Sequence, residues 1–273
     1  MEGRRAIPNP SSIQSSFPHP SSLLTPFTLA VAGKGGTGKT TLAALLVEEL
    51  RERGPVLAVD ADPNSNLGEA LGIPVRRTIG QMRDELLEKI ADLPPGISKD
   101  QLLEMGLYEC LAEGEGVDLL VMGHGEGPRC YCMVNHVLRR CVEALRRNYR
   151  YVVLDNEAGM EHLSRRTTQD VDVLLIVAEP NPVSLRAAQR ISGIAKELKL
   201  HISQTFLVLN KVDADLPVDV GIPVLGKIPY DAEVERLWAG GRPLRELPRH
   251  SPARLAVNRL LEEILKRRGN GNS

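Results

Sequence analysis

The stretch FTLAVAGKGGTGKTT, residues 27–41, joins an apolar run, a glycine-rich segment and the start of a helical pattern. The apolar run predicts a buried strand over 27–32, and the amphipathic residues that follow predict a helix over 40–54. The segment between them fits G-x-x-x-x-G-K-[ST] in the strand–loop–helix context that this motif requires. Glycines there let backbone N–H groups surround phosphate oxygens, and the helix N-terminus adds the positive end of its dipole. The stretch therefore predicts a phosphate-binding loop between a strand and a helix.

This loop supplies most of the candidate nucleotide-binding residues. Lys39 is expected to reach the outer phosphates of a nucleotide, and the Thr40 hydroxyl is expected to hold Mg²⁺. The whole set consists of Gly33, Lys34, Gly35, Gly36, Thr37, Gly38, Lys39, Thr40 and Thr41.

Apolar runs alternate with amphipathic stretches along the rest of the chain. The further predicted strands are 55–62, 117–123, 151–157, 171–180, 204–211 and 222–229, and the further predicted helices are 133–148, 182–198 and 251–269. Continuous apolar strands alternating with helices predict an α/β fold, a doubly wound and mostly parallel sheet with helices on both faces. We expect one domain over 27–268 with a helical insertion at about 64–116, preceded by a disordered, Pro- and Ser-rich extension over 1–26.

Composition excludes several classes of partner. The 273 residues carry 34 basic and 35 acidic side chains, a net charge of -1, and only 3% aromatic residues. This balance favours neither nucleic acid nor an anionic membrane as a partner. No apolar run approaches the roughly 20 residues that span a bilayer. Four cysteines are too few for a disulfide scaffold at this length, and no signal peptide precedes them, so we expect a reducing cytoplasm.

Two predicted strands end in carboxylates, where a doubly wound sheet binds its ligands. The second strand ends in Asp60-Ala61-Asp62, and we expect Asp62 to orient the attacking water while Asp60 serves the structure of the loop. The run YVVLD ends at Asp155, a Walker B pattern whose carboxylate would act on Mg²⁺.

A third strand end carries the candidates for base recognition. The run QTFLVL is followed by Asn210, Lys211, Val212 and Asp213, which matches the N-K-x-D sequence that reads guanine in small GTPases. The residues leave ATP and GTP both open, and the phosphate loop favours ATP.

The remaining chemical signal is a pair of cysteines, Cys130 and Cys132. Two thiolates provide half of a tetrahedral site, and a second copy of the chain would provide the other half. Spacing fits Zn²⁺ or Ni²⁺ equally well, and a redox pair or two buried thiols are alternatives.

The phosphate loop, with Lys34 at its start, resembles the deviant loop of the ParA/MinD-type ATPases. The resemblance implies a nucleotide-sandwich homodimer in which Lys34 acts on the partner's nucleotide, as an arginine finger would. It also implies that Asn210 contacts adenine and that Pro229 packs against the base.

Two longer segments are more specific. GEGPRCYCMVNHVLRR (125–140) and LDNEAGMEHLSR (154–165) resemble the CooC-type nickel-insertion accessory ATPases of carbon monoxide dehydrogenase maturation. The likeness extends over about 27–265. It implies that Cys130 and Cys132 of two chains share nickel, that ATP hydrolysis rearranges the dimer, and that apo-carbon monoxide dehydrogenase is the client.

Two other functions remain open at this point. The first is a partition or positioning ATPase, for which the last helix would be a membrane-binding element. The second is an iron–sulfur redox ATPase, which would carry another cysteine just after Asp155, where this chain has Gly159-Met160-Glu161.

Overall fold

The computed structural model describes residues 26–89, 106–123, 140–143, 145–156, 170–197, 201–213 and 219–270. The predicted extension over 1–26 lies, except for its last residue, outside these described residues. The same holds for the cysteine pair at 130 and 132 and for half of the predicted helix over 133–148. Domain boundaries and the insertion at about 64–116 therefore stay predictions.

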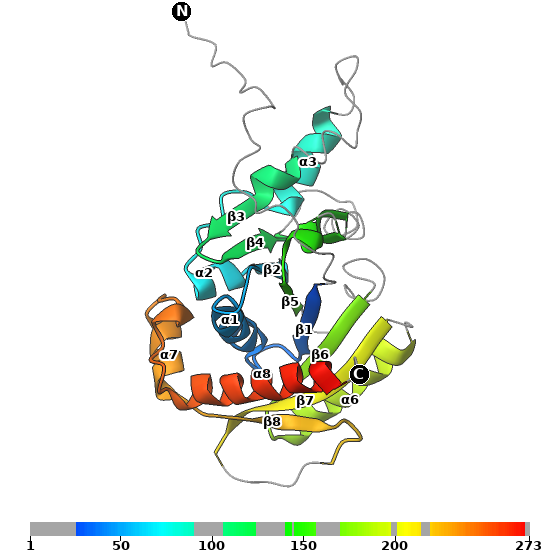
Figure 1. Ribbon diagram of the computed structural model, residues 1–273, viewed down its shortest axis with the longest axis vertical. Helices are drawn as coiled ribbons and strands as arrows, with labels where there is room; N and C mark the ends of the chain where they lie inside the picture. The colour runs from blue at the N-terminus through cyan, green and yellow to red at the C-terminus, as the bar shows by residue number, and fades with distance from the viewer. Residues whose placement is uncertain are drawn as a thin grey trace, which may run out of the picture.

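An eight-stranded sheet forms the middle layer (Figure 1), with the strand order β3-β4-β2-β5-β1-β6-β7-β8. Only β3 and β4 pair antiparallel, and every other neighbouring pair is parallel. This confirms the predicted fold class. The strands are β1 (Phe27–Gly33), β2 (Val56–Ala61), β3 (Leu111–Gly114), β4 (Val117–Val121), β5 (Tyr151–Asn156), β6 (Asp170–Ala178), β7 (His201–Val212) and β8 (Val224–Pro229).

Helices cover both faces of the sheet because successive strand residues point to opposite sides. Leu29 and Val31 belong to a core shared with α1, α2, α7 and α8, whereas Ala30 and Ala32 belong to a core shared with α3 and α6. These helices are α1 (Lys39–Leu50), α2 (Leu67–Leu71), α3 (Ile79–Lys89), α6 (Pro182–Glu197), α7 (Ala232–Ala239) and α8 (Pro252–Asn270), with short 3₁₀ turns at η3 (Arg146–Asn148) and η4 (Leu244–Glu246).

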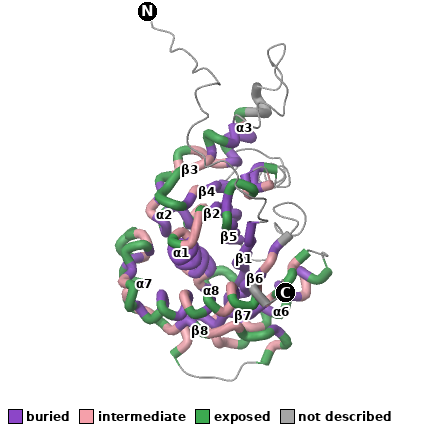
Figure 2. Tube along the Cα trace, viewed as in Figure 1, coloured by how far each residue is buried: buried purple, intermediate pink, exposed green. Residues whose placement is uncertain are grey.

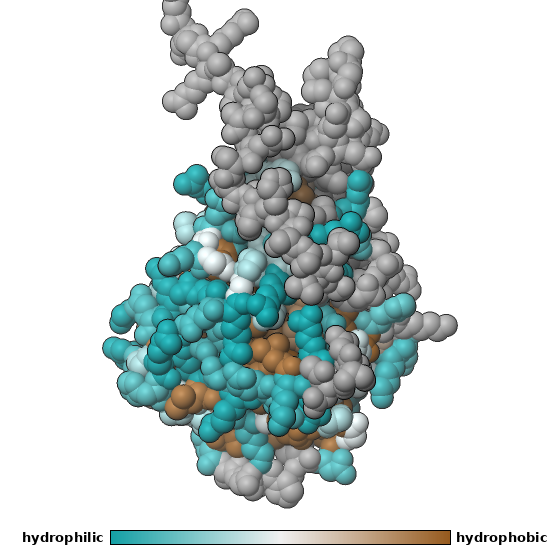
Figure 3. All heavy atoms as spheres, in the orientation of Figure 1, coloured by the Kyte–Doolittle hydropathy of each residue, from teal (hydrophilic) through white to brown (hydrophobic). Residues whose placement is uncertain are grey.

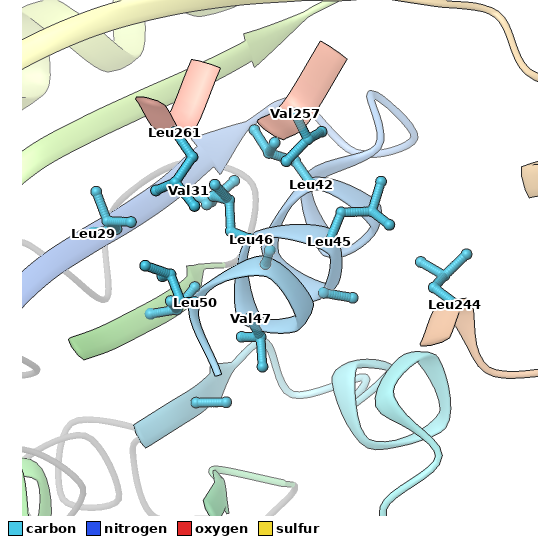
Figure 4. Close-up of a cluster of buried hydrophobic side chains, with 14 of the residues drawn as sticks. Leu29, Val31, Leu42, Leu45, Leu46, Val47, Leu50, Leu244, Val257 and Leu261 are labelled. Atoms are coloured by element: carbon cyan, nitrogen blue, oxygen red, sulfur yellow. The ribbon is translucent and has the colours of Figure 1, made fainter. Parts of the chain in front are cut away.

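The helix that follows the phosphate loop is buried on almost every side. Figure 4 shows Leu42, Leu46 and Leu50 of α1 among side chains of β1 and α8, and all three are at most 1% exposed. A helix that is covered on nearly all sides carries apolar residues around its circumference, and this explains why those of α1 are not confined to one stripe. By contrast, α7 and α8 present exposed residues outward (Figure 2), and the face in Figure 3 is mostly hydrophilic.

A buried ion pair joins α1 to α8 across this core. The Arg254 guanidinium donates to Glu49 Oε1 at 2.7 Å and to the Leu247 carbonyl at 3.0 Å. Asn258 donates to the other oxygen of Glu49 at 2.7 Å. Because both carboxylate oxygens are hydrogen-bonded, the charge can be buried between the two helices.

Three local features differ from the sequence-based expectations. The helix predicted over 40–54 ends at Leu50, because the chain turns where Arg53 N–H donates to the Leu50 carbonyl. The sequence patterns also predicted neither β3 nor α7. Among the described residues, no helix is both long and apolar enough to span a bilayer.

Candidate nucleotide-binding site

A cavity of about 410 Å³ opens at the carboxyl edge of the parallel sheet. It extends from the phosphate loop to the segment that follows β8. Its lining residues are Gly35, Gly36, Gly38, Lys39, Thr40, Thr41, Leu42, Leu45, Asp62, Asn64, Asn66, Asn210, Lys211, Ile228, Pro229, Tyr230, Asp231, Val234, Glu235, Trp238 and Ala253. Open α/β sheets bind their ligands at this edge.

The backbone of the phosphate loop requires glycine at two positions. Gly38 has φ of 90°, and a Cβ atom there would lie 2.2 Å from the Asn210 amide nitrogen. A Cβ at Gly33 would lie 2.4 Å from the Val177 carbonyl oxygen. These close approaches bring β6 and β7 against the loop. The N-cap residue of α1 is Gly38, and no side-chain cap hydrogen bond forms there among the described residues. The free N–H groups of this helix terminus are therefore available to phosphate oxygens.

A buried carboxylate lies behind the loop. Asp155 is 1% exposed, and neither of its carboxylate oxygens has a hydrogen-bond partner. Burial raises the pKa of Asp155 to about 6, opposed by the Thr40 side chain and then by the Lys39 charge. An unpartnered carboxylate beside a threonine hydroxyl is a donor set that suits Mg²⁺. The residues present thus fit the cation that accompanies a nucleoside triphosphate.

Asp60 and Asp62 lie in different surroundings. Asp60 is fully buried, and its two oxygens accept from the Asp62 N–H at 3.1 Å and the Leu67 N–H at 2.9 Å. Burial, followed by the neighbouring Asp155 carboxylate, raises the pKa of Asp60 to about 7. Asp62 lines the cavity, and its Oδ1 accepts from both the backbone and the side-chain nitrogen of Asn64. Asp60 thus organises the loop that presents Asp62.

The far end of the cavity is formed by the ends of β7 and β8. The Asn210 amide nitrogen donates to the Thr37 carbonyl at 2.8 Å, so this side chain joins β7 to the phosphate loop. Lys211, with φ of 54°, places its ammonium 3.7 Å from Glu179 and 3.6 Å from Glu235. Pro229 lines the same end, whereas Asp213 is exposed and does not line the cavity.

Three predicted residues of the loop take other places. Thr37 donates its hydroxyl to the Lys34 carbonyl at 2.8 Å and its N–H to the same oxygen at 3.3 Å, which closes the turn. Lys34 itself is exposed and does not line the cavity, and neither does Gly33. The cysteine pair lies outside the described residues, within which no cluster of three or more metal-ligating side chains occurs.

Two cavity residues escaped sequence reasoning. Asp231 caps α7 by accepting from the Glu233 N–H at 3.0 Å, and it accepts from the Ser251 hydroxyl and the Ala253 N–H at the start of α8. Trp238 donates its indole N–H to the Thr41 hydroxyl oxygen at 3.0 Å. The Asp-x-Glu at 231–233, a helix-start signal, could have revealed α7, but no pattern links residues 41 and 238.

Comparison with known proteins shows the family to which this chain belongs. The model of the CobQ/CobB/MinD/ParA nucleotide binding domain matches residues 28–244. An ATP-binding protein of Methanocaldococcus jannaschii is 39% identical over 88% of this chain and 99% of its own length. The carbon monoxide dehydrogenase accessory protein CooC of Rhodospirillum rubrum is 32% identical over 88% and 97%, respectively.

Solved structures agree on the fold. The cell division ATPase MinD of Pyrococcus furiosus superposes with a TM-score of 0.66 at 24% identity, covering 89% of this chain and 99% of its own. The septum site-determining protein MinD of Pyrococcus horikoshii, solved with Mg-ADP, gives 0.63 at 24% identity over 87% and 95%. The chain therefore belongs to the CobQ/CobB/MinD/ParA family of nucleotide-binding domains, the P-loop ATPase family of the MinD/ParA type.

Proposed function

We propose that this chain is a CooC-type ATPase that binds nickel through Cys130 and Cys132 and supports nickel insertion into carbon monoxide dehydrogenase. The observation that carries the proposal is the 32% identity to CooC over nearly the whole of both chains. The Cys-x-Cys pair at 130–132 supports it, because two thiolates are half of a tetrahedral site that a second chain would complete.

The residues of the cavity would divide the work of hydrolysis as follows. Lys39 and the free N–H groups of α1 hold the phosphates. Thr40 and Asp155 hold Mg²⁺, which neutralises charge on the phosphate oxygens when it is bound. Asp62 stands in the cavity on a loop fixed by Asp60, and there it orients the attacking water.

The geometry of Asn210 favours ATP over GTP. One N–H of its amide donates to the Thr37 carbonyl, which orients the side chain, and its carbonyl oxygen remains available as an acceptor for a ligand in the cavity. An acceptor pairs with the exocyclic amine of adenine and opposes the carbonyl oxygen of guanine. Asp213, which would read guanine in an N-K-x-D site, is exposed away from the cavity. We expect ATP to bind at least tenfold more tightly than GTP in calorimetric titrations.

Dimerisation would complete both sites. Lys34 is exposed at the loop, where a second copy of the chain can be reached, and we assign it to the partner's nucleotide. Lys34→Ala should therefore retain nucleotide binding and lose hydrolysis. Unchanged hydrolysis would remove Lys34 from the mechanism.

Metal binding is tested most directly by anaerobic equilibrium dialysis of the reduced protein against Ni²⁺. We expect one tightly bound Ni²⁺ per two chains, and none in a Cys130→Ser/Cys132→Ser variant. The same titration with Zn²⁺ establishes which metal is preferred. Because thiolates are the ligands, affinity should fall with acid.

The chain offers a matched control in its other two cysteines. Cys110 and Cys141 are each 1% exposed, and burial raises the pKa of their thiols to about 11 and about 12. They stay protonated, so Cys110→Ala/Cys141→Ala should bind Ni²⁺ normally. Absence of cysteine-dependent binding in the first variant would leave an ATPase without a metal cargo.

The membrane-positioning alternative gains no support from α8. Of its apolar stripe, Val257, Leu260, Leu261 and Ile264 are buried against the core, and only Leu255 is about half exposed. A helix whose apolar side chains already pack against α1 and β8 is not free to enter a bilayer.

A further inference from the structure

The cavity contains an aromatic side chain to which no nucleotide-binding motif assigns a role. Trp238 is the single tryptophan of the sequence, and it lines the cavity from α7 beside Val234. Its indole N–H donates to Thr41 Oγ1 at 3.0 Å, across 197 positions of sequence. Thr41 lies in the first turn of α1, directly after the magnesium candidate Thr40.

This hydrogen bond determines what the Thr41 hydroxyl can do. A hydroxyl has one proton to donate and accepts through its oxygen. Indole N–H groups only donate, so Trp238 occupies the oxygen and leaves the Thr41 proton free. Among the described residues the Thr41 hydroxyl donates to no acceptor, and the carbonyl four residues earlier, that of Thr37, accepts from Asn210 instead.

The free proton therefore points to an acceptor in the cavity. Thr41 lines the cavity together with Gly36 and Lys39 of the phosphate loop and with Pro229 and Tyr230 after β8. A ligand with phosphate oxygens in this position would accept from Thr41. Hydrogen bonds in series polarise one another, so an indole that donates to Thr41 makes the hydroxyl a better donor to an anion.

We propose that Trp238 is a positioning residue for the nucleotide: it orients the Thr41 hydroxyl as a donor to a phosphate oxygen. The same contact couples α7, and with it the far wall of the cavity, to the phosphate loop. This inference rests on the nucleotide-binding part of the proposed function and is independent of the metal and of the client.

A double-mutant cycle with Trp238→Phe and Thr41→Val tests the coupling, with ATP, ADP and adenosine as ligands in calorimetric titrations. Phenylalanine keeps an aromatic ring and lacks the N–H, and valine keeps the shape of threonine and lacks the hydroxyl. One neutral hydrogen bond changes an equilibrium constant by roughly three- to tenfold. We expect each single variant to weaken ATP and ADP by about that factor and the double variant to lose no more than either.

Adenosine distinguishes a residue that positions a phosphate contact from one that only lines the cavity. It has no phosphate, so both variants should bind it within about twofold of the unchanged protein. Thr41→Ser, which restores the hydroxyl, should recover ATP affinity. Independent, multiplying losses for ATP, or a Trp238→Phe loss as large for adenosine as for ATP, would overturn the proposal and make Trp238 a wall residue.

Two further measurements test the proposal, one by fluorescence and one without the Trp238 variant. Emission of the single tryptophan should change saturably with ATP, at the concentration that calorimetry gives, and no response to ATP would refute the contact. If Trp238→Phe does not fold, the comparison of Thr41→Val with Thr41→Ser on ATP and adenosine still decides whether the hydroxyl serves a phosphate. Failure of the unchanged protein to bind any of the three ligands would instead refute the proposed nucleotide site itself.

Discussion

Replacing Asp60 by asparagine should stabilise the protein at alkaline pH while slowing its ATPase reaction. Asp60 is fully buried, and burial next to Asp155 raises its pKa from the ordinary 3.8 to about 7. The folded state therefore holds the proton more tightly than the unfolded state. Stability contributed by this proton is complete below pH 3.8, falls as the pH rises towards 7, and stays lost above it.

The size of the effect follows from the pKa. Between pH 5 and pH 8 the unchanged protein loses about 3 kcal/mol through Asp60, because each pKa unit corresponds to about 1.4 kcal/mol. Asparagine cannot ionise, so Asp60→Asn should lack this part of the loss. It retains only one acceptor oxygen for the two N–H groups of Asp62 and Leu67, and the loop that presents Asp62 should be less well fixed.

Urea unfolding of the nucleotide-free protein in EDTA, at pH 5 and pH 8, measures the difference. Glu115→Gln, a change of the same kind at an exposed side chain, controls for a general effect of removing one charge. Steady-state hydrolysis at pH 8 measures the loss of activity. If Asp60→Asn and the unchanged protein lose the same free energy of unfolding between pH 5 and pH 8, Asp60 is ionised at both pH values and the reasoning is refuted.

Three further substitutions test the loop and the core. Gly38→Ala should abolish ATP binding in calorimetric titration without unfolding the chain, since its Cβ would lie 2.2 Å from the Asn210 amide at a φ of 90°; retained affinity would contradict the described loop. Leu46→Ala, at a fully buried position of α1, should lower the free energy of unfolding by about 2–5 kcal/mol, and a loss below 1 kcal/mol would mean that the site collapses around the smaller side chain. Arg254→Met leaves Glu49 buried without its partner and should cost roughly 3–5 kcal/mol by the same unfolding measurement; a loss below 1 kcal/mol would show that the ion pair contributes little to stability.

The central strands and the phosphate loop could be predicted because their signals are local. Seven strands, α6 and α8 coincide with apolar or amphipathic runs to within a few residues, and the loop motif sits where its context requires. By contrast, β3 is four residues long and half exposed, so its burial leaves little hydrophobic pattern. The Glu115-Gly116 pair, with Gly116 at φ of 72°, was the available hairpin signal.

The parts of the site that could not be predicted depend on contacts between distant segments. Asn210 was expected to contact the nucleobase. Its donation to the Thr37 carbonyl could not be predicted, because it depends on how closely β7 approaches the loop at Gly38. Trp238 reaches Thr41 because β8 ends at Pro229 and Asp231 starts α7 directly afterwards, at the rim of the cavity. Residue type and spacing carry no information on such approaches.

The packing of α8 on α1 has a consequence for the order in which the chain can fold during synthesis. The family match ends at residue 244, whereas α8 (252–270) supplies Val257 and Leu261 to the core around α1. A nascent chain must therefore carry the phosphate-loop helix, complete since residue 50, with an apolar face uncovered until α8 has been made, about 200 residues later. Contacts this distant in sequence close slowly and leave hydrophobic surface open to aggregation. Nucleotide binding should consequently follow the synthesis and docking of α8.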